Sequence, residues 1–285
     1  MAKNKLSDKS PFIPLLLFII LCILLVSVGI IKEIKKERVP FSEPVVKERK
    51  TTVTKKPVPP PIKGKASIGI IIDDLGWSKD IAKEIERINR PITVALLPFA
   101  PYSKEIFQDI KDKRSIDMIL HLPLEPRPPA QALEKGIITT DMNDSEINRK
   151  FQEALEYFYP GVKGVNNHQG SLFTSDEEKM RVLLKIIQSK SLFFVDSMTV
   201  RQSKGYIIAK EMGVKTAKRD VFLDNESDPQ YIEGQIRELV ETAKKEGKAI
   251  GIGHARKNTI AVLKKVLPEI EKEGVTIVPV TSLLE

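Results

Sequence analysis

The three histidines of this 285-residue chain each stand at the end of a run that is typical of a buried β-strand. These runs cover residues 116–121, 164–168 and 249–254, and they end in His121, His168 and His254. A fourth run, 68–72, is followed by the carboxylate pair Asp73 and Asp74. Strand carboxyl ends converge on one rim of a parallel α/β sheet, where ligands bind. These residues are therefore expected to share one site, and its Asp and His composition is typical of a metal-dependent hydrolase.

Strand-like runs alternate with amphipathic helical stretches from Ala66 to the end of the chain. The strand-like runs lie near 67–73, 92–97, 116–121, 163–168, 192–196, 214–217, 249–253 and 275–279. The helical stretches lie near 78–89, 103–113, 144–158, 176–190, 228–246 and 257–272. Ser78 and the pairs 143–144 and 175–176 are candidate N-caps for three of these helices. Repeated βα units predict a mainly parallel sheet, and seven or eight strands in one domain favour a barrel-like closure.

The excess of basic residues lies outside this alternating part of the chain. The net charge is +8, but residues 1–65 hold 14 Lys and Arg against 5 Asp and Glu, which leaves 32 against 33 for residues 66–285. A nucleic-acid-binding protein carries its basic face on the folded body, so nucleic-acid binding is not expected. The absence of a GxGxxG or P-loop sequence likewise gives no support for a dinucleotide or nucleoside triphosphate site.

The segment 12–31 contains no charged residue and is rich in Leu and Ile. Its length of about 20 residues matches a bilayer-spanning helix, so residues 1–31 are interpreted as a cytoplasmic stub and a retained membrane anchor. The alternative is a cleaved signal peptide. Residues 32–65 include six prolines and predict an extended spacer. We therefore expect one folded domain, 66–285, outside the cytoplasm, in the periplasm or at the cell surface.

Asp73 and Asp74 are adjacent carboxylates that follow a buried run, and burying them is costly unless a metal or charge partner meets them. Neighbouring strand residues point to opposite sides, so the two can take different roles. The alternative is a helix N-cap near Ser78 with a spare acid. For His121 taken alone, a buried imidazole that has satisfied its hydrogen bonds is an equal alternative, and for His254 the alternative is a polar rim without a role in function.

Further polar side chains near the strand ends are candidates for substrate binding. They are Trp77, Asn167, Ser171, Asp196, Arg219 and Asp220. For the charged members, structural ion pairs are the alternative. For the loop around His168, the alternative is stabilisation by its own side-chain hydrogen bonds. Trp77 is suited to stacking on a sugar ring, or equally to packing behind the acidic turn.

Six segments in this order resemble the polysaccharide deacetylase superfamily, and specifically its divergent branch. They are 71–74, 121–126, 164–171, 196–199, 219–224 and 251–254. The resemblance implies a distorted (β/α) barrel of about seven parallel strands and a divalent metal, usually Zn²⁺. It also implies metal-assisted removal of acetyl groups from an envelope polysaccharide. The alternative is a catalytically silent domain of the same fold that binds a glycan or a protein at the envelope.

The resemblance also implies roles for single residues. Asp73 corresponds to the general base, Asp74 to a metal ligand and His254 to the general acid. Two histidines spaced four apart normally complete the metal site, but here His121 is followed at that spacing by Glu125. We predict Asp74, His121 and His168 as ligands, because one carboxylate and two imidazoles suit zinc, with Glu125 as the alternative ligand.

Overall fold

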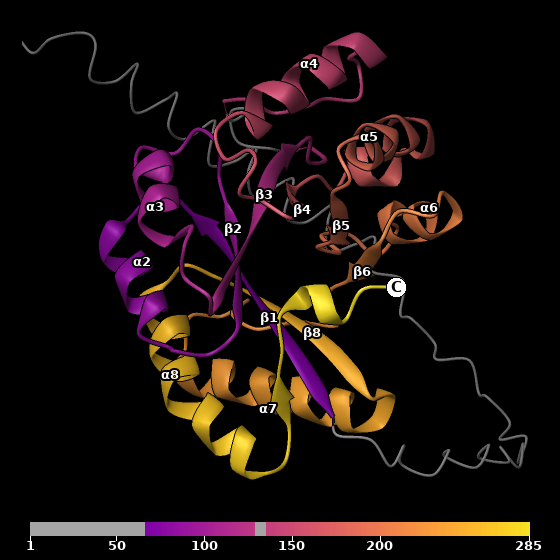
Figure 1. Cartoon of the computed structure of the whole chain (residues 1–285). Coiled ribbons are helices and arrows are strands. Elements are labelled where there is room, and N and C mark those ends of the chain that lie inside the picture. Colours follow the sequence, from indigo (N-terminus) through magenta and orange to yellow (C-terminus); the bar gives the residue numbers. More distant parts are fainter. Residues whose placement is uncertain (1–65, 129–134) are drawn as a thin grey trace, which may run out of the picture. The chain divides into compact units, whose positions relative to one another are not determined.

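Strands and helices alternate along the described chain, which comprises residues 66–128 and 135–285 of a computed structural model (Figure 1). The strands are β1 (Ser67–Leu75), β2 (Ile92–Leu96), β3 (Ile116–Leu124), β4 (Gly164–Gln169), β5 (Phe193–Asp196), β6 (Thr216–Lys218), β7 (Val221–Phe222), β8 (Lys248–His254) and β9 (Thr276–Ile277). The α-helices are α2 (Lys79–Glu86), α3 (Ser103–Ile110), α4 (Asp144–Leu155), α5 (Glu177–Ser189), α6 (Gly205–Glu211), α7 (Pro229–Glu246) and α8 (Lys257–Lys272). Two 3-10 helices complete the set, η1 (Phe173–Ser175) and η2 (Val280–Ser282).

All strand pairs are parallel, and the strands follow the order β6-β5-β4-β3-β2-β1-β8-β7, with β9 paired to β1. The two ends of this order, β6 and β7, are separated in the chain by Arg219 and Asp220 alone. The sheet must therefore curl until its edges come close. The N–H of Arg219 donates to the carbonyl of Asp196 on β5, and that of Asp220 donates to the carbonyl of Ile250 on β8. The predicted distorted barrel is confirmed as a curled, incompletely closed one.

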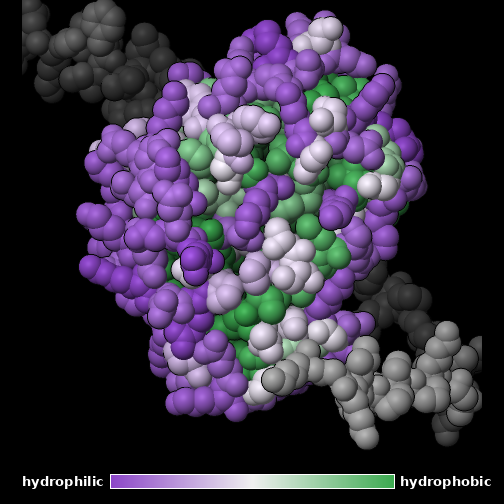
Figure 2. Space-filling view, viewed as in Figure 1, coloured by the Kyte–Doolittle hydropathy of each residue, from purple (hydrophilic) through white to green (hydrophobic). Residues whose placement is uncertain are grey.

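Alternation along the strands divides the core into two layers. On β1, Ile70 and Ile72 belong to the larger cluster, which includes the helices, whereas Ile71 belongs to a smaller cluster with Ile119 and Ile252. The helices lie around the outside of the curled sheet (Figure 1). On the face shown in Figure 2, hydrophilic side chains cover most of the outer surface and hydrophobic ones gather between them. Truncating such a buried isoleucine to alanine typically costs about 2–5 kcal/mol.

The helix starts follow local capping chemistry. The Ser78 side chain accepts from the N–H of Ile81, and Asn143 forms a reciprocal capping box with Glu146. The Asp176 side chain accepts from the N–H of Lys179 at the start of α5. The three N-caps predicted from sequence are confirmed. Helix α6 and strand β7 were not predicted, because seven and two residues are too short to give a clear periodic signal.

The predicted anchor and spacer, residues 1–31 and 32–65, lie outside the described residues. Within 66–128 and 135–285, no helix is long and apolar enough to cross a membrane. The domain boundary near Ala66 stays a prediction.

Candidate functional site

The inner face of the barrel changes from hydrophobic to polar as the strands approach their carboxyl ends. Side chains two residues apart lie on the same face of a strand, so Asp73, His121 and His254 continue the inward rows begun by Ile71, Ile119 and Ile252. The strand register pairs Asp73 with His254 and His121 with Asn166. Residues far apart in the sequence are thereby brought to one rim, as predicted.

Asp74 joins this group through an unusual backbone conformation. Its φ is +62°, and the register between β1 and β2 shifts between Ile72 and Leu75. A positive φ is uncommon for a residue other than glycine, although Asp tolerates it better than most. The alternation that would turn Asp74 away from Asp73 is broken here, so both carboxylates approach His121. Such a conformation costs of order 1–3 kcal/mol and persists where the surrounding structure enforces it.

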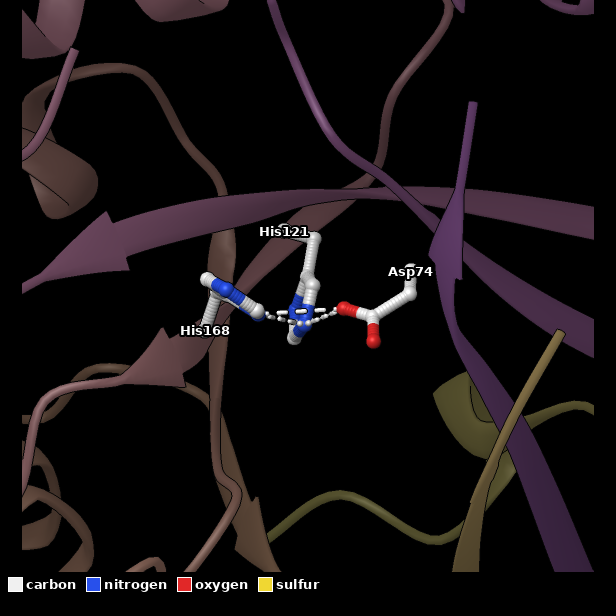
Figure 3. Close-up of side chains that lie close together, drawn as sticks. All are labelled: Asp74, His121 and His168. Carbon is white, nitrogen blue, oxygen red and sulfur yellow. Dashed lines mark hydrogen bonds and ion pairs between the residues drawn. The ribbon is translucent and has the colours of Figure 1, made fainter. Parts of the chain in front are cut away.

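Asp74, His121 and His168 form a compact set of potential ligand atoms. Asp74 Oδ1 lies 3.3 Å from His121 Nε2 and 3.0 Å from His168 Nδ1. The two ring nitrogens are 3.1 Å apart. Figure 3 shows the Asp74 carboxylate directed toward both imidazoles. One potential ligand atom from each residue lies within 4.8 Å of the others, which is close enough for all three to hold one metal ion.

The environment of Asp74 Oδ1 favours a bound cation. This atom is buried, and among the described residues it has no well-aligned hydrogen-bond donor. A buried carboxylate oxygen whose imidazole neighbours are not aligned as hydrogen-bond donors is incompletely satisfied, and a metal ion would complete its contacts. One carboxylate and two imidazoles form a donor set that suits zinc. The residues present therefore fit the predicted divalent metal.

The electrostatics of the rim are set by burial and close opposite charges. Burial raises the pKa of Asp73 above its usual range, although His121 and a hydrogen bond from Asn166 act against the increase. Burial would also raise the pKa of Asp74, but its contacts with His121 and His168 prevail and lower it. Burial opposes protonation of His121, yet Asp73 and Asp74 raise the pKa of its imidazole to about 9.

His254 is oriented by a second carboxylate. The ring atom Nδ1 lies 2.8 Å from Asp224 Oδ1, and the backbone N–H of His254 donates to Asp224 Oδ2 at 2.8 Å. The Thr259 hydroxyl donates to the same oxygen at 2.6 Å. Despite its burial, these hydrogen bonds lower the pKa of Asp224. With Nδ1 turned to Asp224, His254 Nε2 faces the rim, 3.8 Å from Asp74 Oδ2.

A cavity of about 500 Å³ opens beside these residues and is lined by Asp73, His121, His168 and His254. Three of the predicted substrate-binding residues, Asn167, Ser171 and Arg219, also line it. The Arg219 guanidinium donates to the carbonyls of Ser197 and Met198, at 2.7 and 2.6 Å. These bonds hold the cation in place at the cavity wall.

The alternative ligand Glu125 is not part of the cluster. Its Oε2 accepts from the N–H and the hydroxyl of Thr140, both at 2.7 Å. These bonds engage one oxygen of the carboxylate, and the residues whose potential ligand atoms lie together are Asp74, His121 and His168.

The structure places three predicted substrate-binding residues away from the cavity. The Asp196 carboxylate is fully buried and accepts from Ser203 Oγ and the N–H of Tyr206 at the start of α6. Asp220 accepts from the N–H of Ile250 and borders a different cavity. Trp77 is 61% exposed and borders a separate cavity of about 170 Å³. For Asp196 and Asp220, the alternative of a structural role fits these positions.

Asp224 and Asn166 were not among the predicted site residues. Asp224 ends a strand-like segment, as Asp73 does, and that signal was available in the sequence. Asn166 was less visible, because a neutral amide within a strand gives no charge or metal-ligand pattern. The unusual signal was an amide pair, Asn166 and Asn167, in the buried part of a strand.

Comparison with known proteins assigns the family. The family model described as divergent polysaccharide deacetylase matches residues 70–284. An uncharacterized protein of Haemophilus influenzae is 34% identical over 209 residues, which make up 73% of this chain and 74% of that protein.

Solved structures show the same fold. The structure of an uncharacterized protein from Agrobacterium tumefaciens C58 has a TM-score of 0.72 at 23% identity, and the match covers 79% of this chain and 92% of that one. A second match is to a mutant of a CE4 family pseudoenzyme from Bacillus anthracis, in which enzymatic activity is restored. It has a TM-score of 0.53 at 15% identity, and the match covers 78% of this chain and 68% of that one. From the match over residues 70–284 and the Haemophilus relative, this chain belongs to the divergent polysaccharide deacetylase family.

Proposed function

We propose that this protein is a divalent-metal-dependent hydrolase that removes acetyl groups from an envelope polysaccharide. The observation that carries the proposal is the buried Asp74 Oδ1, which lacks an aligned donor among the described residues and lies beside His121 Nε2 and His168 Nδ1. Asp74, His121 and His168 would hold the metal, and zinc suits this donor set. The family name indicates acetylated polysaccharide as the class of substrate.

Asp73 is the proposed general base. When bound, the metal supplies Lewis acidity toward the acetyl oxygen and toward water. Asp73 takes a proton from the attacking water, because its Oδ2 lies beside the ligand set, 3.7 Å from His121 Nε2. Burial raises the pKa of this carboxyl, which makes the ionised form a stronger base. The Asn166 amide holds the other oxygen, Oδ1, at 2.8 Å.

His254 is the proposed general acid. Its Nδ1 is engaged by Asp224, so Nε2 is the nitrogen that can exchange a proton at the cavity. In the complete reaction the water oxygen bonds to the acetyl carbon and the bond from that carbon to the sugar nitrogen breaks. Acetate leaves, and His254 gives a proton to the departing amine. An O-acetyl group would follow the same sequence, with an alcohol leaving.

The cavity residues support binding of a polar substrate. Asn167, Ser171 and Arg219 line the same cavity as the proposed base and acid. The fixed guanidinium of Arg219 offers a positive charge, and the neighbouring side chains offer hydrogen-bonding groups.

The proposed location follows from the sequence. With segment 12–31 as a membrane anchor and 32–65 as a spacer, the domain would reach envelope polysaccharide from outside the cytoplasm. Protease added to spheroplasts, whose outer layers are opened while the inner membrane is intact, should then digest the domain. A domain that stays intact until the inner membrane is lysed would contradict this location.

Acetate release tests the activity. The full-length chain, purified in detergent and loaded with zinc, should release acetate from acetylated peptidoglycan or from chitooligosaccharides. A chelator should abolish the release, and added zinc should restore it. Asp74→Ala should release none. Glycan binding without acetate release by the zinc-loaded parent would contradict the proposal and favour the silent binding domain, a possibility that the similar pseudoenzyme fold keeps relevant.

A further inference from the structure

Asn166 is a fully buried amide that contacts two of the proposed functional groups at once. It lies on β4, in register with His121 on β3 and Val195 on β5. Its Oδ1 is 2.8 Å from His121 Nδ1, and its Nδ2 donates to Asp73 Oδ1 at 2.8 Å and to Ser197 Oγ at 3.2 Å. One side chain therefore touches both the proposed base and a proposed metal ligand.

The chemistry of these neighbours fixes the orientation of the amide. An ionised carboxylate can only accept hydrogen bonds, so the NH₂ group of Asn166 faces Asp73. The amide oxygen then faces His121, and the ring nitrogen next to it, Nδ1, must carry a proton. When the imidazole is neutral, its lone pair is consequently on Nε2, the atom nearest Asp74 and His168. The opposite tautomer would set two acceptors against each other in a buried place.

Resting on the proposed function, we infer that Asn166 is a positioning residue that sets the His121 tautomer for the metal and holds Asp73 for proton transfer. The amide oxygen contacts His121 and the amide nitrogen contacts Asp73. Because the amide is rigid and planar, it aligns the proposed metal ligand and the proposed base together. Ser197 limits rotation of the amide from the β5 side. The metal site and the base are thus mechanically coupled through β4.

Two substitutions separate the two contacts. Asn166→Asp keeps an acceptor for the Nδ1 proton of His121 but replaces the donor to Asp73 with a second acidic oxygen. Asn166→Ala removes both contacts. Asn167→Ala is the matched control for zinc binding alone, because Asn167 lines the proposed substrate cavity but is the next residue, is 1% exposed, and makes two hydrogen bonds of its own. Asn167 Nδ2 donates to the carbonyl of Gln169, and Asn167 Oδ1 accepts from the backbone N–H of Ser197. Neither bond involves Asp73 or His121.

The experiment measures zinc affinity of the full-length chain in detergent, by competition with a chromophoric chelator, and the pH profile of acetate release. Asn166→Ala should weaken zinc binding by about 10–100-fold, the usual effect of removing a group that orients a metal-bound histidine. Asn166→Asp should bind zinc close to the parent level. Its acetate release should need a higher pH, because a second carboxylate disfavours ionisation of Asp73. Asn167→Ala should bind zinc as the parent does, even if its melting temperature falls.

Three results would overturn the inference. Parental zinc affinity and pH profile in both Asn166 variants would leave the function intact and remove the role of Asn166. Equal loss of zinc binding in Asn166→Ala and Asn167→Ala would reduce that role to packing. A parent chain that takes up no zinc and releases no acetate would overturn the proposed function and the inference with it.

Discussion

The two ends of the barrel each carry a cluster of charged groups, and the clusters are balanced in different ways. At the amino ends of β6 and β8, Glu285 receives hydrogen bonds from Lys210 at 2.6 Å and Tyr206 at 2.7 Å, with Lys248 at 3.2 Å. These groups lower the pKa of Glu285 to about 2. At the carboxyl ends, Asp74 has two imidazole neighbours and a buried oxygen without an aligned donor among the described residues.

The difference separates a structural cluster from a site. Glu285 is partly exposed and each of its oxygens has a cationic partner, so the cluster is complete without any ligand. Its backbone also pairs with Thr216 on β6, which fastens the end of the chain to the sheet edge. Asp74 is held in a strained conformation and is incompletely satisfied. A buried charge cluster that contains an incompletely satisfied polar atom indicates a ligand-binding site. The presence of charged groups alone does not.

Zinc content is the most direct way to test this contrast. Asp74→Ala and His168→Ala should each lower zinc affinity by more than about 100-fold, because each removes a proposed ligand rather than its support. Glu285→Ala, at the other end of the barrel, should keep about one zinc per chain. Metal analysis after dialysis measures all of these proteins. Retention of stoichiometric zinc by both site variants would contradict the assigned ligands.

Asp73→Asn tests the division of labour within the site. Turnover should fall by about 10²–10⁴-fold, because the amide cannot accept the proton from water. Zinc content should stay at the parent level, since Asp73 is not among the proposed ligands. Acetate release and metal analysis on the same sample check both parts. Normal hydrolysis by this variant would show that another group is the base.

Zinc affinity should also depend on pH, because the proposed ligand His121 must lose a proton before it can bind the metal. The pKa of His121 is raised to about 9 in the metal-free protein, so below that pH zinc must displace its proton. Apparent affinity should therefore rise with pH by up to about tenfold per unit between pH 7 and 9, and then level off. Chelator competition at a series of pH values measures the slope. A flat profile would contradict a protonated His121.

The smallest effect is expected for Glu285→Gln, which should cost about 0.5 kcal/mol of unfolding free energy at pH 7, since the ion pairs are partly exposed. A carboxyl with a lowered folded-state pKa stabilises the protein above its unfolded pKa of about 4.3. That contribution is lost as the pH falls toward about 2. Urea unfolding of both proteins should therefore converge at low pH. A constant difference would point to packing as the cause.

The sequence alone could predict the barrel and the convergence of Asp73, Asp74, His121, His168 and His254 at one rim. Both follow from strand-like runs with polar ends, because parallel strands bring these ends together whatever their separation in the chain. Strand ends were less exact. The strand-like run that was predicted to end at His121 continues as β3 to Leu124.

The remaining features depend on contacts that carry no local signal. One oxygen of Glu125 accepts hydrogen bonds from Thr140, and the Asp196 carboxylate accepts from Ser203 and from the start of α6. Neither partner forms a periodic or motif-like pattern with the acid. Asn166 was not predicted because its contact with His121 depends on the register between β3 and β4.

The central position of β1 has a consequence for synthesis of the protein. This strand comes first in the folded domain, yet it pairs with β8 and β9, which come near the end, and Asp73 is the register partner of His254. On a ribosome that adds about 5–20 residues each second, β1 must wait about 10–35 seconds for β8 to be made. The proposed base and acid can meet only when almost the whole chain has been made, so no nascent fragment could carry the complete site.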